Sequence, residues 1–434
     1  MTLFLNWNDD AFSQKFKSLI AEKKENSHDV NKTVADILHA VKTNGDAALV
    51  EYSAKFDKLN ITPDQFLISQ ARIDAAIDEC DPKIVEALRF AHKRISDYHA
   101  RQQPEDDLYE DEQGITLGHR WNAVDSVCLY VPGGLASYPS SVLMNAAPAK
   151  VAGVKRIVMT VPTPNGVLNP LVLAAAKIAE VDEVYCLGGA QAVGAFAYGT
   201  DSIEPVSKIV GPGNAYVAAA KRQVFGIVGI DMIAGPSEIL VLADSENHPN
   251  WIAADLLAQA EHDTSAQSIL IIVEEAFGKK VVTAIEKELA INPRHEIARK
   301  SWEDNGAIIV AKDWAHAAEL ANIIAPEHLE LAIEEPEAMF DMIEHCGAVF
   351  LGRYTPEAVG DYVGGPNHVL PTAKSARFSS GLNILDFMKR SSILKCSAEG
   401  LDKIGPAGVI LGHAEGLFGH ARSIELRLNI NDNK

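Results

Sequence analysis

The sequence is poor in features that mark secreted and membrane-spanning proteins. Its 434 residues contain only five cysteines, none in a C-x-x-C pair, so neither a disulfide framework nor a cysteine zinc motif is indicated. No apolar run reaches the roughly 18 residues of a membrane-spanning helix. Residues 1–10 also lack the basic and long apolar stretches of a secretory signal. We therefore expect a cytoplasmic protein that does not bind a membrane.

Positive charge is scarce as well. The chain has 39 Lys and Arg against 59 Asp and Glu, a formal net charge of −20. Affinity for nucleic acid comes largely from Lys and Arg, so this balance argues against a nucleic-acid partner. It says little about a small substrate, because a pocket can differ in sign from the surface. With 47% hydrophobic residues, the chain can bury a substantial core, which excludes a disordered chain and favours two or more folding units.

The N-terminal hundred residues have the apolar spacing of helices. One predicted helical face carries Val34, Ile37, Leu38 and Val41. Asp81-Pro82 predicts the start of a further helix, with an N-cap followed by proline. Residues 102–114 are polar and rich in acids, so we expect a solvated loop there.

Short β-rich runs alternate with helical stretches through the middle of the chain. A first series covers residues 126–130, 156–161, 183–187 and 208–210. A second covers residues 238–243, 268–273, 306–311, 328–333 and 348–351. This alternation is typical of βαβ units in a parallel sheet. We therefore expect an α/β protein with two Rossmann-like parallel-sheet domains, an N-terminal helical segment and an extended, mostly helical C-terminal arm.

The same rhythm suggests domain boundaries. The second block of strands is expected to pack with the N-terminal helices, and residues 423–428 look strand-like. The predicted parts are an arm of residues 1–24, a first domain of residues 25–129 with 239–381, a second domain of residues 130–238, and a C-terminal arm of residues 382–434.

Glycine-rich loops follow three runs of the first series. They are Val131-Pro-Gly-Gly134, Gly188-Gly-Ala-Gln191 and Gly211-Pro-Gly-Asn214. In open parallel sheets ligands bind at the carboxyl ends of the strands, where small residues let backbone N–H groups approach a pyrophosphate. None of the loops matches G-x-G-x-x-G or a Walker loop, so each singly can be a plain tight turn. Three in one sheet make a dinucleotide site as well supported as plain turns, with Tyr130, Gln191 and Asn214 as candidate contacts.

Imidazole, carboxylate and amide groups gather in four segments, namely residues 255–263, 326–328, 360–368 and 415–420. Gln259 and His262 are three apart in a predicted helix and so share a face. Such a ligand set suits a borderline ion such as Zn²⁺, and an open coordination position would make the ion catalytic. No H-x-x-x-H pair is present, which leaves open the alternative of structural polar residues and helix caps.

These four clusters, in this order, resemble those of the histidinol dehydrogenase family, the zinc- and NAD-dependent enzymes that complete histidine biosynthesis. The resemblance extends along nearly the whole chain. It includes Tyr52-Ser-Ala-Lys-Phe-Asp57, Ala234-Gly-Pro-Ser-Glu238, Gln259-Ala-Glu-His262, Ala325-Pro-Glu-His-Leu329, Gly360-Asp-Tyr362, Asn367-His-Val-Leu-Pro-Thr372 and Ala414-Glu-Gly-Leu417 with His420. The chain departs from the family pattern at Pro366 and Gly419, neither of which carries a reacting group.

The resemblance implies a role for each site residue. The implied ligands of one zinc ion per subunit are Gln259, His262, Asp361 and His420. The implied acid/base pair is Glu327 and His328. The implied substrate contacts are Ser237, Gln259, His262, His328, Asp361, Glu415 and His420. The implied NAD contacts are Tyr130, Gln191 and Asn214. The resemblance also implies a homodimer whose C-terminal arm crosses to the partner subunit, so Glu415 and His420 would complete the neighbouring site.

The implied reaction is the four-electron oxidation of L-histidinol to L-histidine through L-histidinaldehyde, with water and two NAD⁺ consumed. An imidazole suits removal of the alcohol proton near neutral pH, which favours His328 as the base. Glu327 would activate the water of the second oxidation. Two alternatives are a related zinc/NAD dehydrogenase of another small polar alcohol, such as a sulfonated diol, and a catalytically silent dinucleotide-binding scaffold.

Overall fold

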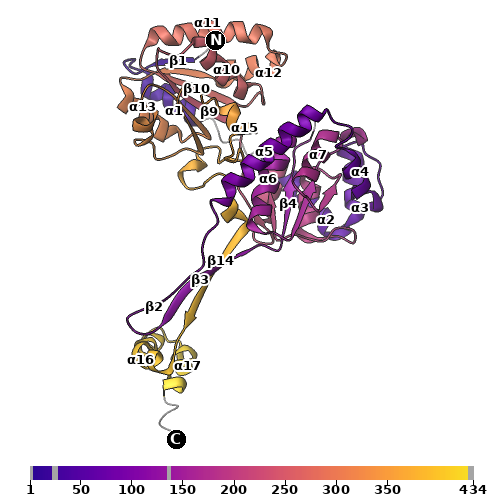
Figure 1. Ribbon diagram of the computed structural model, residues 1–434, viewed down its shortest axis with the longest axis vertical. Helices are drawn as coiled ribbons and strands as arrows, with labels where there is room; N and C mark the ends of the chain where they lie inside the picture. The colour runs from indigo at the N-terminus through magenta and orange to yellow at the C-terminus, as the bar shows by residue number, and fades with distance from the viewer. Residues whose placement is uncertain (1–2, 22–27, 134–137, 429–434) are drawn as a thin grey trace. The chain divides into compact units, whose positions relative to one another are not determined.

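The computed structural model describes residues 3–21, 28–133 and 138–428. The chain forms two compact units, each built from two separate segments (Figure 1). The first unit comprises residues 1–102 and 125–387, and the second comprises residues 103–124 and 388–434. Within the described residues, no helix combines the length and the apolar character needed to cross a bilayer.

The first unit contains two parallel sheets, as the sequence predicts. The larger sheet has the strand order β1-β11-β10-β9-β12-β13. Its strands are β1 (Leu3–Asn6), β9 (Glu238–Ala243), β10 (Gln267–Ile272), β11 (Ala307–Val310), β12 (His328–Ala332) and β13 (Ala348–Leu351). Its helices are α1 (Phe12–Ala21), α10 (Pro249–Ala260), α11 (Glu275–Ile291), α12 (His295–Asn305), α13 (Trp314–Ile324), α14 (Pro336–Phe340) and α15 (Glu357–Tyr362).

Helices cover both faces of the larger sheet. In β9, Ile239 and Val241 pack against α10, α11 and α12, whereas Leu240 and Leu242 face the opposite layer with α1 and α13. Successive side chains of a strand point to opposite faces. Both faces are buried, so the strand is apolar from Ile239 to its end, as is typical of parallel sheets between two helical layers.

The smaller sheet has the order β6-β5-β4-β7-β8. Its strands are β4 (Ser126–Tyr130), β5 (Arg156–Thr160), β6 (Glu183–Tyr185), β7 (Lys208–Val210) and β8 (Gly229–Ile230). The helices before and between its strands are α2 (His28–Asn44), α3 (Asp46–Phe56), α4 (Gln70–Ala75), α5 (Pro82–Ala100), α6 (Pro139–Ala152), α7 (Pro170–Ile178), α8 (Gly189–Tyr198) and α9 (Ala215–Val224). Short 3₁₀ turns are η1 (Pro63–Gln65), η2 (Pro164–Gly166), η3 (Ser375–Arg377) and η4 (Ile384–Phe387).

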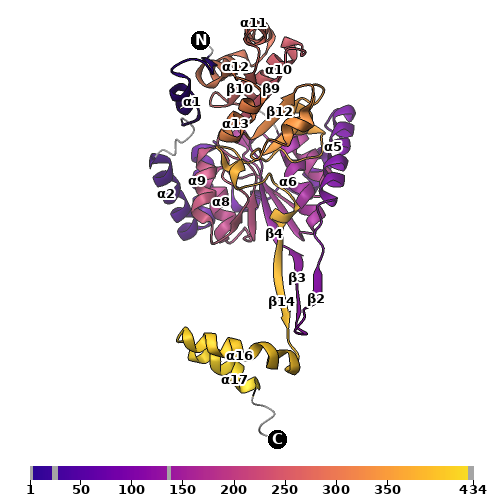
Figure 2. The same cartoon turned by 90° about the vertical axis from the view of Figure 1, so that its left-hand side faces the viewer.

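The N-terminal helices pack on the smaller sheet, so their expected grouping with residues 239–381 is wrong. Leu38 and Val41 of α2 share a buried cluster with Val193 of α8 and Val217 of α9, and Figure 2 shows α2 beside these helices. The predicted boundary at residue 130 also falls inside β4. Residues 3–6, expected in an arm, pair with β11 as β1. An apolar stripe reveals that a helix is buried but not which sheet it covers.

The second unit is an antiparallel sheet followed by two helices. The sheet has the order β14-β3-β2, formed by β2 (Asp107–Glu110), β3 (Thr116–Ala123) and β14 (Met388–Lys395). The helices α16 (Ala398–Ala414) and α17 (Phe418–Leu428) contact each other closely, since a Cβ at Gly412 would lie 3.0 Å from the Ala421 nitrogen. The described part of the predicted arm, residues 382–428, therefore contains the strand β14 as well as two helices.

Two local predictions fail in this unit. Residues 107–110 form β2 instead of a loop, and all four are exposed, so no apolar alternation could reveal the strand. Residues 423–428 belong to α17. Their alternating apolar residues are typical of a strand. In the structure they instead form part of a helix that packs against α16, where His413 and Glu425 form an ion pair at 3.0 Å. Tertiary contacts here override local pattern.

Candidate active site

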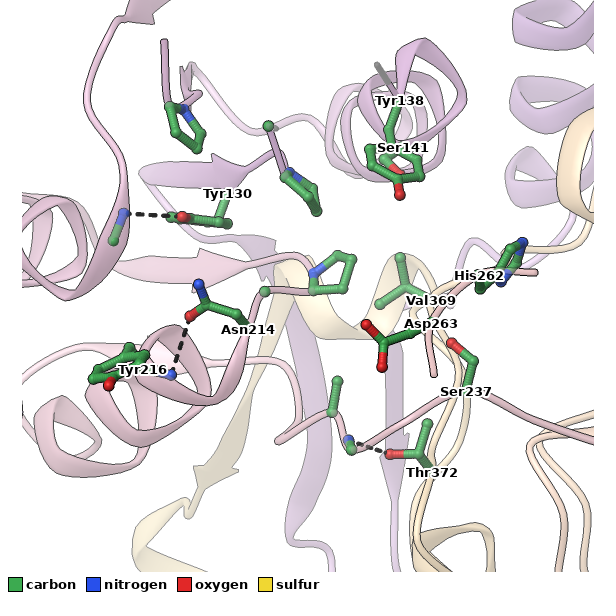
Figure 3. A pocket seen from close by; sticks show the side chains of 18 of the residues that line it. Tyr130, Tyr138, Ser141, Asn214, Tyr216, Ser237, His262, Asp263, Val369 and Thr372 are labelled. Carbon is green, nitrogen blue, oxygen red and sulfur yellow. Dashed lines mark hydrogen bonds between the residues drawn. The ribbon is translucent and has the colours of Figure 1, made fainter. Parts of the chain in front are cut away.

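A cavity of about 760 Å³ in the first unit is lined by the ends of strands from both sheets. Eight residues predicted from the sequence line it, namely Tyr130, Gln191, Asn214, Ser237, His262, Glu327, His328 and Asp361. Figure 3 shows Tyr130 and Asn214 on one side of the cavity and Ser237 and His262 on the other. The smaller sheet contributes the carboxyl ends of its strands, the general expectation for ligand sites of such sheets, whereas Ser237, Glu327 and His328 lie at the amino ends of β9 and β12.

On the smaller-sheet side, the cavity wall consists of tight glycine loops. The Tyr130 hydroxyl accepts a hydrogen bond from the Gly189 N–H at 3.0 Å. Gly189 has φ +67°, and a Cβ there would lie 2.6 Å from Gln191 Oε1, so the position requires glycine. Asn214 caps α9 by accepting the N–H groups of Tyr216 and Val217. Pro132 and Gly133 of Val131-Pro-Gly-Gly134 also line the wall, whereas Gly134 lies outside the described residues.

On the larger-sheet side, Glu327 and His328 are held by the backbone of Glu238. Glu327 Oε2 accepts the Glu238 N–H at 2.8 Å. His328 Nδ1 lies 2.9 Å from the Glu238 carbonyl oxygen. A carbonyl only accepts hydrogen bonds, so Nδ1 carries the proton and Nε2 keeps its lone pair. His328 Nε2 has no hydrogen-bond partner among the described residues, which leaves it available as a base.

Burial shifts the acid/base behaviour of both residues toward their neutral forms. The pKa of His328 is lowered by desolvation, against the opposing charge of Asp361. The pKa of Glu327 is raised well above its usual value by desolvation, and the hydrogen bond from Glu238 opposes that shift. Perturbed groups that share a cleft are typical of catalytic sites.

A group of possible metal ligands adjoins this pair. His328, Glu357 and Asp361 each place one ligand atom within 4.8 Å of the others. Gln259 is fully buried, and neither its Oε1 nor its Nε2 has a partner among the described residues. An unsatisfied buried amide is costly, and a bound cation would satisfy its oxygen. The donors present therefore fit a metal ion with nitrogen and oxygen ligands.

His368 fixes the position of Asp361. Its Nδ1 lies 3.1 Å from the Asp361 carbonyl oxygen, and its Nε2 lies 3.3 Å from Ser141 Oγ. The sequence reading missed Glu357, which is 2% exposed and places Oε1 3.5 Å from His328 Nε2. The available signal was its spacing, because residues 357 and 361 are four apart and share a helical face.

Not every predicted residue meets in this cavity. Gln259 lies on α10, next to His262, but is not part of the cavity lining. Glu415 and His420 belong to the second unit, where both are exposed. Whether they join the ligands of the first unit stays a prediction.

A buried pair of carboxyl groups connects the three elements that carry these residues. Asp255 of α10 hydrogen-bonds Glu330 of β12, and Glu330 also accepts the backbone N–H of Glu357 in α15. Desolvation raises the pKa of Asp255 to about 6. Desolvation, followed by the charge of Asp255, raises the pKa of Glu330 well above its usual value. The two carboxyls therefore share a proton at neutral pH.

Replacing Glu330 with glutamine should stabilise the fold at high pH. A carboxyl group whose pKa is higher in the folded than in the unfolded state stabilises the fold in its protonated form. That stability is complete below the unfolded-state pKa, about 4, and is lost as the pH rises through the folded-state pKa. Glutamine can keep the hydrogen bonds to Asp255 and to the Glu357 N–H, and it does not ionise, so it does not lose stability as the pH rises. We expect equal free energies of unfolding at pH 4.5, and a gain of roughly 1–3 kcal/mol for the variant at pH 8. Urea denaturation measures both, with exposed Glu337→Gln as control, and an equal gain at both pH values would refute the shared proton.

The chain is similar to known proteins along nearly its whole length. A family model described as histidinol dehydrogenase matches residues 20–428. The chain is 58% identical to histidinol dehydrogenase of Rhizobium meliloti over 432 residues, covering 100% of both proteins. It is 57% identical to histidinol dehydrogenase of Rhodospirillum rubrum, covering 99% of each. The crystal structure of histidinol dehydrogenase from Elizabethkingia anophelis superposes with a TM-score of 0.94 at 35% identity, covering 99% of both chains. The chain therefore belongs to the histidinol dehydrogenase family and is an oxidoreductase of histidine biosynthesis.

Proposed function

We propose that this enzyme oxidises L-histidinol to L-histidine through L-histidinaldehyde, with NAD⁺ as oxidant and one Zn²⁺ in each site. The observation that carries the proposal is the buried Nε2 of His328, which has no hydrogen-bond partner among the described residues and belongs, with Asp361, to the lining of a cavity bounded by glycine loops. Relatives with this activity in their names at 57–58% identity support L-histidinol over a sulfonated diol.

His328 would act as the base in both oxidations. In the first, Nε2 accepts the hydroxyl proton while the carbon-bound hydrogen leaves as hydride to NAD⁺, which gives the aldehyde and NADH. The Glu238 carbonyl holds Nδ1–H, which fixes the tautomer and the direction of the free lone pair. Because burial lowers its pKa, His328 remains unprotonated at neutral pH.

Glu327 would prepare the second oxidation. Its Oε2 is held by the Glu238 N–H. In the ionised form of Glu327, which its raised pKa makes a strong base, the other oxygen would take a proton from water as that water adds to the aldehyde. The resulting hydrate loses a second hydride to a second NAD⁺ and a proton to His328. One L-histidinol, one water and two NAD⁺ thus give L-histidine, two NADH and three protons, which His328 and Glu327 pass on to solvent.

The proposed zinc ligands are Gln259, His262, Asp361 and, from a neighbouring chain, His420. When bound there, Zn²⁺ would orient the substrate and polarise its reacting oxygen. Tyr130, Gln191 and Asn214 are the proposed NAD contacts, and the arrangement of the loops at the strand ends supports this assignment. A homodimer with crossed C-terminal arms and a cytoplasmic location remain predictions.

The reaction itself is tested by NADH absorbance. We expect each L-histidinol to yield two NADH. Dialysis against a chelator should remove most of the activity, and added Zn²⁺ should restore it. A sulfonated diol offered at the same concentration serves as the competing substrate. Zinc-replete protein that forms no NADH from L-histidinol would contradict the proposal.

A further inference from the structure

A buried ion pair holds the backbone of one glycine in the cavity wall. Lys221 of α9 and Asp231, which follows β8, form this pair, with side-chain exposures of 3% and 0%. Asp231 Oδ2 accepts the Gly211 N–H at 2.8 Å. Lys221 Nζ donates to the Gly211 carbonyl oxygen at 2.9 Å. Both polar backbone groups of Gly211 are therefore bound by charged partners.

Gly211 controls the direction in which the chain leaves β7. Its φ is +106°, and a Cβ there would lie 2.3 Å from the Tyr130 carbonyl oxygen, so only glycine fits. The following loop residues Pro212, Gly213 and Asn214 line the cavity. At the far end of the loop, Asn214 caps α9, the helix that carries Lys221. The loop is thus fixed by charges at its start and by a helix cap at its end.

Stability alone is a weak explanation for this pair. Removing two charges from water costs several kcal/mol, and apolar replacements of similar volume are often as stable as a buried ion pair. Hydrogen bonds from charged groups are shorter and about twice as strong as neutral ones. Here both charges act on the backbone of the same residue, at the edge of the cavity. Their effect is to fix the loop geometry.

The geometry points to Lys221 and Asp231 as positioning residues for dinucleotide binding. They are not in contact with the proposed acid/base residues Glu327 and His328. They hold the Gly211–Asn214 loop in the conformation that receives the cofactor. This inference rests on the proposed NAD dependence. It predicts that the pair determines affinity for the dinucleotide and leaves substrate affinity and the chemical steps largely unchanged.

Three variants separate loop positioning from overall stability. Lys221→Met removes the donor to the Gly211 carbonyl and leaves Asp231 as a buried, unbalanced charge. Asp231→Asn keeps an oxygen for the Gly211 N–H but leaves the lysine unbalanced. The double variant removes both charges, so no unpaired charge remains buried. Its thermal midpoint should recover toward that of the unaltered protein, because no lone charge is buried.

The control is another ion pair of the same sheet. Arg156 Nε and Glu183 Oε1 lie 2.8 Å apart at the first residues of β5 and β6, the opposite edge from the cavity loops. Glu183→Gln should lower the thermal midpoint without changing dinucleotide affinity. Affinity is measured by fluorescence titration with NADH alone, and steady-state kinetics give KM and kcat.

We expect Lys221→Met and the double variant to bind NADH about tenfold or more weakly, since each loses a charged hydrogen bond to the loop. KM for NAD⁺ should rise in parallel, while KM for L-histidinol and kcat at saturating NAD⁺ stay nearly unchanged. Folded variants that bind NADH as the unaltered protein does would overturn the inference, and so would equal weakening by Glu183→Gln. Failure of the unaltered protein to bind NADH would instead overturn the proposed function.

Discussion

Replacing His328 with glutamine should lower kcat for L-histidinol by roughly a thousandfold, within the range typical of a lost general base. Glutamine retains an amide N–H that can bond the Glu238 carbonyl, but it cannot accept a proton. Metal content, measured by elemental analysis, should stay that of the unaltered protein. The comparison therefore separates proton transfer from metal binding.

The pH dependence gives an independent test of the same residue. Desolvation lowers the pKa of His328, so the imidazole stays unprotonated until the pH falls below the ordinary value near 6.5. The acidic limb of kcat/KM should accordingly lie below about pH 6.5 and disappear in His328→Gln. His295→Gln, at an exposed position in α12, should leave rate and profile unchanged. Substantial loss of metal from His328→Gln would make His328 a ligand instead of the base.

The residues that line the cavity can be predicted from the sequence more fully than the packing of the helices around them. Strand periodicity indicates both parallel sheets, and the structure confirms them. The residues that the family resemblance implies for the first unit converge in or beside one cavity, although they come from loops far apart in sequence. On the smaller sheet the loops follow their strands, and the carboxyl ends of parallel strands lie at one end of a sheet. On the larger sheet, Ser237, Glu327 and His328 instead lie at the amino ends of β9 and β12, which also share one end of their sheet. A local strand pattern therefore predicts which residues lie at the same end of a parallel sheet, even when they are far apart in the sequence.

What the sequence could not reveal depends on long-range contacts without a local signal. β1 has only four residues, too few for a periodicity to be recognised, and it is fixed by pairing with β11. Leu38 shows that α2 is buried but not that it packs against α8 and α9. Glu357 and the carboxyl pair beneath it look like surface acids in the sequence. Their burial follows from the contact between α15 and β12, which no spacing rule specifies.

The second large effect concerns the two histidines proposed as zinc ligands in different units. His262→Asn and His420→Asn should each lower kcat by a thousandfold or more, because loss of a ligand from a catalytic metal site impairs both orientation and polarisation of the substrate. Circular dichroism and thermal midpoints should remain near those of the unaltered protein. His413→Asn, a substitution in α16 of the same arm, should retain most of the activity.

Mixing the two inactive variants tests whether the arm crosses between chains. If it does, each mixed dimer combines one chain with an intact Gln259, His262 and Asp361 and one chain with an intact His420. One site of that dimer then has every ligand, and random exchange should restore about a quarter of the unaltered activity. If each chain completes its own site, every site lacks one histidine and mixing restores nothing. Differently tagged chains verify that exchange occurred, so activity that stays absent in confirmed mixed dimers would assign His420 to the chain that carries it.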